Sequence, residues 1–375
     1  MRENEVAGKR LKLRFYAVVI LVALVAAPLS LPSKQDKQGW VGAYPPLSEV
    51  FEDIRLFAEN HPELADLEII GKSVEGRPLY MLHIGRKDGR ERPEALITAN
   101  IHAGEVISSQ VAMEACRRLL EDEGDDPWIT SLLDQTDFYI VPVLNPDGYH
   151  RVISTGGKGG DIGIRKNANG VDLNRNFPLV PGADSWHPLA GSDNPDSNYY
   201  MGEKPLSEPE TRAIAELARE HNFYAALNMH SVAGKFLYPY CFDDKVAPHS
   251  SQFESMGRAF VHKQPERDYK VEQSYGWYPT LGDMDDFLYI RYGVLSATIE
   301  HGIVSHNFTY ALVNRPFVFW IMNPYDAQNW VENDADAVLA AIEKALSITG
   351  GKSYSPSECK PEPEENRWES LATKP

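Results

Sequence analysis

Cysteine is scarce in this chain of 375 residues. The three cysteines, Cys116, Cys241 and Cys359, are widely spaced and form no C-x-x-C pair. An odd number of isolated cysteines indicates neither a disulfide scaffold nor a metal site built from thiolates. Any metal ion must therefore be bound by histidine and carboxylate side chains.

Positive charge is also in short supply. The chain has 37 Lys and Arg residues against 54 Asp and Glu residues, a formal net charge of -17, and no basic stripe interleaved with aromatic residues. Such a surface would repel the phosphate backbone of a nucleic acid. We therefore exclude nucleic acid as a partner, whereas the acidity would suit either solubility or basic substrates.

Several common catalytic motifs are missing as well. The chain contains no H-E-x-x-H zinc-protease helix and no G-x-S-x-G serine elbow. The glycine-rich stretch "GGKGGDIG" (156–163) does not fit the G-x-G-x-x-G pattern of a dinucleotide site. These absences exclude the commoner zinc-protease helix and give no support to a serine hydrolase or a dinucleotide enzyme.

One long apolar run occurs, near the N-terminus. Residues 15–31 are apolar and follow four basic residues between positions 9 and 14, which is the order found in an export signal. Pro28 disfavours cleavage next to the small residues before it. Residues 1–31 are therefore predicted to be a signal peptide or an uncleaved membrane anchor, with an ordinary buried helix as the remaining alternative. A signal peptide would make the protein secreted or periplasmic, and an uncleaved anchor would attach it to the membrane outside the cytoplasm.

Alternating apolar patterns predict strands and helices in turn along the chain. Strands are predicted at residues 79–85, 94–100, 138–144, 223–229 and 294–300, and helices from Glu105 onward and at residues 208–220 (capped by Ser207), 251–263 and 336–346. Strands separated by helices indicate an α/β fold with a mixed, largely parallel sheet and helices on both faces. In such folds ligand sites lie in the loops beyond the strand ends.

Composition separates one folded domain from two flanking segments. Residues 32–44 are predicted to be a linker and residues 45–350 a single domain. Residues 351–375 are rich in Pro, Glu and Ser and poor in aliphatic residues, so we expect a disordered tail.

His102 and Glu105 stand where a predicted strand meets a predicted helix. A spacing of three residues puts the two side chains on one side of the backbone, which suits ligation of one Zn2+ ion, although such pairs also occur by chance. A catalytic zinc ion needs three protein ligands and one open position. The best candidate for the third ligand is His230, at the end of a predicted strand, although alone it would more often be a packed or surface histidine.

Six motifs occur in order along the chain: "IGKSVEGRPLYML" (70–82), "HAGE" (102–105), "NPDGY" (145–149), "NGVDLNRNF" (169–177), "NMHS" (228–231), and a sixth made of "WYPTLGDMDDF" (277–287) together with "SATIEHG" (296–302). Together they resemble the zinc carboxypeptidases of the carboxypeptidase A/B type. The resemblance implies the fold of that family, with residues 45–350 as the catalytic domain. It also implies one zinc ion per chain and peptide substrates.

The resemblance assigns the zinc ion to His102, Glu105 and His230. Asp172 is then the carboxylate that orients His102, in keeping with the rule that a ligating imidazole donates its far N–H to an acceptor.

The resemblance also assigns catalytic and substrate-binding roles. Glu300 is similar to the general base of the family and Arg165 to the arginine that stabilises the oxyanion. Asn174 and Arg175 are similar to the pair that binds the terminal carboxylate, a task that suits the planar fork of arginine. Tyr278 lies 22 residues before Glu300, at the position of the mobile tyrosine that closes on the substrate.

Substrate preference depends on Asp285 within "GDMDDF" (282–287). In the branch of the family that removes Lys and Arg, an aspartate at this position lies at the bottom of the specificity pocket. The alternative is a surface acid in an acid-rich loop.

Three functions stay open. The first is an exported metallocarboxypeptidase that removes C-terminal residues, with basic ends preferred. The second is a cell-wall hydrolase of the same fold that cuts the stem peptide between γ-D-glutamate and diaminopimelate. The third is a non-catalytic peptide-binding module. We expect a monomer that contacts a membrane only through its N-terminal segment.

Overall fold

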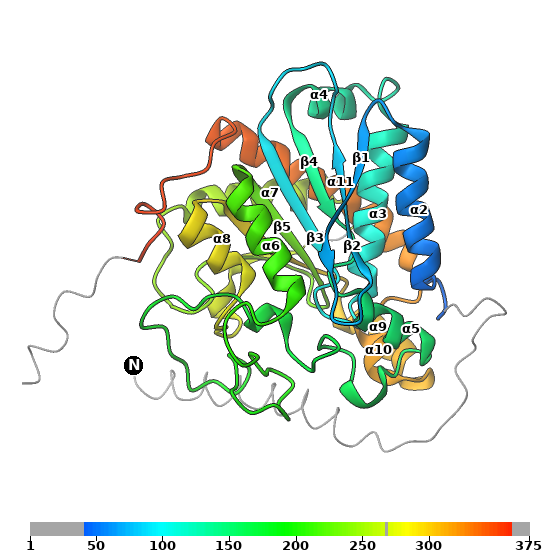
Figure 1. The fold of residues 1–375 in the computed structure, drawn as a ribbon, viewed down its shortest axis with the longest axis vertical. Coiled ribbons are helices and arrows are strands. Elements are labelled where there is room, and N and C mark those ends of the chain that lie inside the picture. The colour runs from blue at the N-terminus through cyan, green and yellow to red at the C-terminus, as the bar shows by residue number, and fades with distance from the viewer. Residues whose placement is uncertain (1–40, 267–268, 362–375) are drawn as a thin grey trace, which may run out of the picture.

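A mixed sheet forms the centre of the computed structural model, which describes residues 41–266 and 269–361 (Figure 1). The described strands are β1 (Ala65–Lys72), β2 (Pro78–Ile84), β3 (Glu94–Ala99), β4 (Asp137–Val141), β5 (Phe223–Ser231), β6 (Lys235–Tyr238), β7 (Lys270–Gln273) and β8 (Leu295–His301). They form one 8-stranded sheet in the order β1-β2-β4-β3-β5-β8-β6-β7. The β4-β3-β5-β8 core and the β6-β7 pair are parallel, and the other neighbours are antiparallel. The predicted mixed, largely parallel α/β fold is confirmed.

Helices cover both faces of this sheet (Figure 1). They are α2 (Leu47–Asn60), α3 (Val106–Glu121), α4 (Pro127–Gln135), α5 (Pro146–Ser154), α6 (Pro209–Glu220), α7 (Ser250–Lys263), α8 (Met284–Tyr292), α9 (Val304–Val313), α10 (Phe317–Met322) and α11 (Ala327–Thr349). Apolar residues of α2, α3, α7 and α11 share one core cluster, and those of α6 and α8 share a second with other sheet residues. Two apolar cores explain why the central strand β5 is buried at every position.

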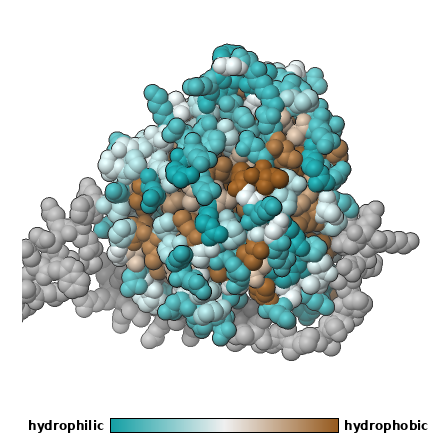
Figure 2. Space-filling view, in the orientation of Figure 1, coloured by the Kyte–Doolittle hydropathy of each residue, from teal (hydrophilic) through white to brown (hydrophobic). Residues whose placement is uncertain are grey.

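One face of the molecule is mainly polar (Figure 2). The face of the molecule in Figure 2 is mostly hydrophilic, with hydrophobic residues showing in separate patches. This distribution agrees with the acid-rich composition. Among the described residues, no helix is long and apolar enough to cross a membrane.

Two helices differ in detail from the sequence-based expectation. The cap of α6 is Glu208, and the Ser207 hydroxyl instead donates to the Glu208 carboxylate at 2.6 Å. Helix α11 begins at Ala327, well before the predicted residue 336. Its early turns carry the buried polar residues Asn333 and Asp334, which interrupt the apolar pattern in the sequence. Gln264 donates to Asp334 at 2.7 Å, so this burial depends on a tertiary contact.

The folded core begins earlier than the predicted boundary at residue 45. Val41 and Tyr44 are buried, and the Tyr44 hydroxyl donates to the carbonyl of Pro324 at 2.7 Å. The linker prediction is therefore wrong for residues 41–44. The rest of the linker and the N-terminal export or anchor segment lie outside the described residues.

The first part of the predicted disordered tail is packed against the domain. Cys359 is buried, and its carbonyl accepts a hydrogen bond of 2.9 Å from Tyr240. The ring of Tyr354 stacks on His249 with centroids 3.7 Å apart. The prediction is therefore wrong for residues 351–361, because a few apolar anchors outweigh the polar composition. Residues 362–375 lie outside the described part of the chain.

The parallel core of the sheet gathers the candidate site residues at one edge. In the sheet register Met229 pairs with Ala99 and His230 pairs with Glu300. The carboxyl ends of β3, β5 and β8 therefore lie side by side. In parallel sheets, ligands bind in the crevice outside these strand ends.

Candidate metal centre

His102, Glu105 and His230 come together beyond the ends of β3 and β5, and we call them the metal cluster. All three are buried, and one potential ligand atom from each lies within 4.8 Å of the others. Nδ1 of His102 lies 2.9 Å from Oε1 of Glu105, and Nδ1 of His230 lies 2.9 Å from Oε2 of the same carboxylate. Two imidazoles and one carboxylate directed at a common point are a donor set that suits zinc. The residues present therefore fit the metal that their motif implies.

Asp172 fixes the orientation of His102. Its Oδ1 atom lies 3.1 Å from Nε2 of His102 and also accepts from the backbone N–H of Asn174 at 3.1 Å. Burial alone would raise the pKa of Asp172, but Arg165, Arg175 and His102 outweigh burial and hold it well below its usual range. Because an ionised carboxylate only accepts, Nε2 of His102 carries the proton. Nδ1 is then free to bind a metal.

Glu300 lies beside the metal cluster at the end of β8. It is 7% exposed, and its Oε2 atom has no hydrogen-bond partner among the described residues. Burial and the negative charge of Glu105 raise the pKa of Glu300 well above the ordinary value, and the nearby cations Arg165 and Lys235 offset only part of the shift. A buried carboxylate with an unused oxygen and a raised pKa can exchange protons near neutral pH.

Arg165 lies on the other side of Asp172. Its Nε donates to Oδ2 of Asp172 at 2.7 Å, while its buried Nη2 has no hydrogen-bond partner among the described residues. The guanidinium lies 5.0 Å from the ring centroid of Tyr199, and that of Arg175 lies 5.8 Å from the same ring. Tyr199 was missed by the sequence analysis, because it stands in an irregular loop without a motif. The free donor of Arg165 is suited to a developing negative charge.

Arg175 is almost completely buried, at 1% exposure. Its Nε and Nη2 donate to the carbonyl of Leu189 at 3.3 and 2.9 Å, and its Nη1 donates to the carbonyl of Asn174 at 2.7 Å. A guanidinium has five N–H groups, so these contacts hold its plane in place and leave donors for a ligand.

Tyr278 is half-buried near both arginines. Its ring stacks on His187 with centroids 6.1 Å apart. Burial raises the pKa of Tyr278 to about 12, against the opposing effect of Arg175 and Arg165. The phenol therefore keeps its proton and can donate a hydrogen bond to a ligand.

Asp285 lies inside the protein, so the surface-acid alternative is wrong. It is 1% exposed and accepts hydrogen bonds of 2.6 Å from the hydroxyls of Ser296 and Thr298 on β8. Burial and the charge of Asp283 raise the pKa of Asp285 to about 8. The helix α8 turns this side chain towards the sheet, which the sequence of an acid-rich loop does not reveal.

Asp283 connects the neighbourhood of Asp285 to Asn174. Its Oδ2 accepts from Nδ2 of Asn174 at 3.1 Å and from Thr280 at 3.3 Å. Its Oδ1 accepts from the backbone N–H of Asp285 at 2.9 Å and from Sγ of Cys241 at 3.5 Å. We call Cys241, Asp283 and Asp285 the acid cluster. Sequence reasoning missed Asp283, although the same "GDMDDF" stretch contains it.

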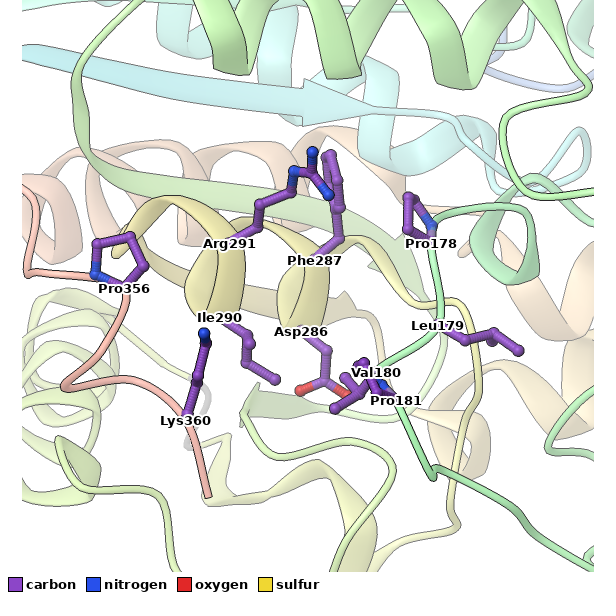
Figure 3. Close-up of a pocket in the computed structure, with 10 residues that line it drawn as sticks. All are labelled: Pro178, Leu179, Val180, Pro181, Asp286, Phe287, Ile290, Arg291, Pro356 and Lys360. Atoms are coloured by element: carbon purple, nitrogen blue, oxygen red, sulfur yellow. The ribbon is translucent and has the colours of Figure 1, made fainter. Parts of the chain in front are cut away.

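A separate cavity of about 260 Å³ lies against α8 (Figure 3). It is lined by Asp286 and Ile290 of α8, by the loop from Pro178 to Pro181, and by Pro356 and Lys360 of the C-terminal segment. None of the candidate site residues lines it. The Asp286 carboxylate accepts from the backbone N–H groups of Cys241 and Phe242, so we assign it a supporting role.

Comparisons with known proteins point to one family. A family model described as zinc carboxypeptidase matches residues 50–314. Carboxypeptidase A4 of Mus musculus is 34% identical over 221 residues, which cover 58% of this chain and 51% of the relative. Carboxypeptidase B of Bos taurus is 31% identical over 253 residues, which cover 65% of this chain and 59% of that relative. The chain thus spans about half the length of the curated relatives it matches.

Solved structures agree with the sequence matches. Bovine thrombin-activatable fibrinolysis inhibitor, in complex with tick carboxypeptidase inhibitor, has a TM-score of 0.65 and 26% identity, covering 82% of this chain and 98% of that chain. Carboxypeptidase A of Helicoverpa armigera has a TM-score of 0.68, and the match covers 92% of this chain and 82% of that chain. Because its sequence identity is only 21%, this match supports the fold alone. None of these proteins is named as a cell-wall hydrolase, so the stem-peptide alternative is not favoured.

Proposed function

This chain belongs to the zinc carboxypeptidase family, and on that premise we propose that it is a metallocarboxypeptidase that hydrolyses the C-terminal peptide bond of peptides. The observation that carries the proposal is the convergence of two histidines and one glutamate beside Glu300, a buried carboxylate with an unused oxygen. A non-catalytic binding module would not need that carboxylate.

The metal cluster would hold one zinc ion through Nδ1 of His102, the carboxylate of Glu105 and Nδ1 of His230. When bound, zinc would supply a Lewis acid that polarises the scissile carbonyl and activates water. Asp172 keeps His102 in the tautomer that leaves Nδ1 free.

Glu300 and Arg165 would carry the proton and charge movements. Glu300 accepts the proton of the attacking water and returns it to the departing amine, which matches its raised pKa. The unused Nη2 donor of Arg165 stabilises the oxyanion that forms at the carbonyl.

The chain-end specificity would come from Asn174, Arg175 and Tyr278. Arg175 is held in a fixed plane by backbone carbonyls, so its remaining donors can bind both oxygens of a terminal carboxylate. Tyr278 donates a further hydrogen bond. An internal peptide bond offers no carboxylate to this group, so only the last residue is released.

Asp285 would select basic C-terminal residues. It is a buried carboxylate that accepts from two hydroxyls and lies beside the negative charge of Asp283, so a Lys or Arg side chain would balance the charge and an acidic one would be rejected. Asp283, which borders both Asp285 and Asn174, adds to that negative field.

Residue release measured by mass spectrometry tests this function. We would use peptides ending in Arg, Lys, Leu, Phe or an amide, with zinc, a chelator and a Glu300→Gln control. Release from free Arg and Lys ends, but not from amides, supports the proposal. Release from amidated peptides would contradict the carboxylate-binding role, and equal activity of the Glu300→Gln variant would contradict the base. Export, membrane anchoring through residues 1–31 and the monomeric state stay predictions.

A further inference from the structure

Helices α9 and α10 concentrate the exposed apolar side chains of the described chain. Eleven large hydrophobic residues are exposed in the described part of the structure, and six of them fall between positions 304 and 325. We call these six residues the α9–α10 patch: Val304, Phe308, Leu312, Val313, Val318 and Tyr325. A concentration of this kind indicates a surface that meets something other than water.

Helix α9 turns most of its large apolar residues away from the core. Val304, Phe308 and Leu312, spaced four residues apart, face outward with 40%, 37% and 51% exposure. The buried side carries Asn307 and Ala311, and Asn307 donates to the carbonyl of Ile321 at 2.9 Å. A helix on a water-facing surface normally turns its apolar stripe to the core. Here the exposed side carries the larger apolar residues, alongside three polar ones, and can therefore contact an apolar medium.

The charge of this segment also differs from that of the rest of the chain. Residues 302–325 contain no Asp, Glu or Lys and only one Arg, Arg315, within a chain of net charge -17. Membrane surfaces are commonly anionic and repel acidic protein faces. The segment can therefore approach a bilayer without that repulsion.

The described chain begins against the same helices. Gly42 packs so closely on Trp320 of α10 that a Cβ atom at this glycine would lie 2.6 Å from the indole. The ring of Tyr44 meets Phe319 edge-on, with centroids 5.8 Å apart. Residues 32–40 separate Val41, where the described chain begins, from the apolar run at 15–31. A connection of nine residues spans at most about 30 Å, so a bilayer that held the run would be within reach of α10.

We propose that residues 15–31 anchor the chain in a lipid bilayer and that the α9–α10 patch docks on the surface of that bilayer. The short connection raises the effective concentration of the patch at the bilayer, so modest apolar contacts suffice. Asn323, just after α10, donates to the carbonyl of Gly104 at 2.7 Å and accepts from the N–H of Ile107 at 3.0 Å. Docking would thus fix the orientation of the loop that carries His102 and Glu105 relative to the membrane.

Depth-dependent fluorescence quenching on the full-length chain tests this docking. The three native cysteines are buried, so Val313→Cys and Ile69→Cys can each be labelled selectively with an environment-sensitive fluorophore. Val313 is 70% exposed on the patch and Ile69 is 59% exposed on β1, which makes the two sites a matched pair. In phosphatidylcholine–phosphatidylglycerol vesicles with brominated acyl chains, we expect a blue shift and a loss of fluorescence at position 313, and neither at position 69.

Controls separate the patch from the N-terminal run. A Leu312→Ser, Val318→Ser variant keeps residues 15–31, so it should remain vesicle-bound yet lose the quenching at position 313, with peptidase activity in solution unchanged. Equal quenching at positions 313 and 69 would overturn the proposal. A fluorophore at position 313 that is already shielded from water before vesicles are added would also overturn the proposal. If that shielding increased with protein concentration, the patch would bind a second copy of the chain. If it did not depend on concentration, another segment of the same chain would cover the patch.

Discussion

The metal cluster and the acid cluster are two buried groups of ionisable residues beside the sheet, with opposite electrostatics. In the metal cluster, burial alone would raise the pKa of Glu105, but His102 and His230 lower it well below its usual range. In the acid cluster, burial and Asp283 raise the pKa of Asp285 to about 8. The first group is balanced by imidazoles of the protein itself, whereas the second contains carboxylates and a thiol.

Because of this difference, the two groups are suited to bind different kinds of positive charge. The metal cluster presents one ionised carboxylate beside two imidazoles, and a divalent cation binds that carboxylate together with the neutral form of each imidazole. The acid cluster holds a buried carboxylate that stays largely protonated until a positive charge arrives, and we propose that the substrate side chain brings that charge.

Replacement of Glu300 by glutamine should cause the largest loss. The variant cannot accept the proton of water, so we expect kcat to fall by about 10²–10⁴-fold. Zinc content, measured by atomic emission, should remain at the wild-type level because Glu300 lies outside the metal cluster. Retained turnover would show that another group is the base.

Replacement of Arg165 by methionine removes the unused donor but keeps an apolar stem. We expect kcat to fall by about 10²–10³-fold, as for loss of one oxyanion donor. The split between kcat and KM distinguishes this role from simple substrate binding, which would change KM alone.

Replacement of Asp172 by asparagine disturbs the metal cluster without touching a ligand. The amide can no longer fix the tautomer of His102 as an ionised carboxylate does, so zinc affinity should fall by about 10–100-fold. Competition with a fluorescent chelator measures this change. The exposed Asp161→Asn provides a control with the same loss of charge, and equal affinities in the two variants would refute the orienting role.

Replacement of Asp285 by asparagine should change selectivity more than turnover. A hydrogen bond to a charged group contributes about 1.5–3 kcal/mol, so the preference for Arg over Leu ends in kcat/KM should drop roughly 10- to 100-fold. The exposed Asp244→Asn, three positions after Cys241 in the sequence, has the same charge change and should leave the preference intact. An unaltered preference in Asp285→Asn would remove this residue from the specificity pocket.

The preference for basic ends should also rise with pH, by a smaller amount. Because the pKa of Asp285 is raised to about 8, this carboxyl is largely neutral below that pH and charged above it. About a tenth is already ionised at pH 7, so the gain between pH 7 and pH 9 is at most about tenfold. The ratio of kcat/KM for Arg and Leu ends measures it, and the ratio should be flat in Asp285→Asn.

Most of the candidate site could be predicted from the sequence, because its residues stand at strand ends. His102, His230 and Glu300 follow apolar runs that predict neighbouring parallel strands, and the motifs around them resemble one family. Tyr199 and Asp283 could not be found in this way. Tyr199 lies in an irregular loop, and only the packing of α8 decides which acid of "GDMDDF" faces which neighbour.

The ends of the domain were the least predictable part of the fold. Composition alone predicted a linker through residue 44 and a tail from residue 351. The structure instead buries Tyr44 and Cys359, because each finds a hydrogen-bond or apolar partner far away in the chain.

The sequence by itself determined the class of this protein: apolar periodicity set the strands and helices, and residue chemistry at the strand ends set the metal-binding motifs. Tertiary structure alone decided which polar groups are buried and which charged groups lie close together. It paired Asp172 with His102 and placed Asp283 beside Asp285. It also turned most of the large apolar side chains of α9 outward. The reason is physical, since burial and charge proximity depend on contacts between distant segments that local patterns do not encode.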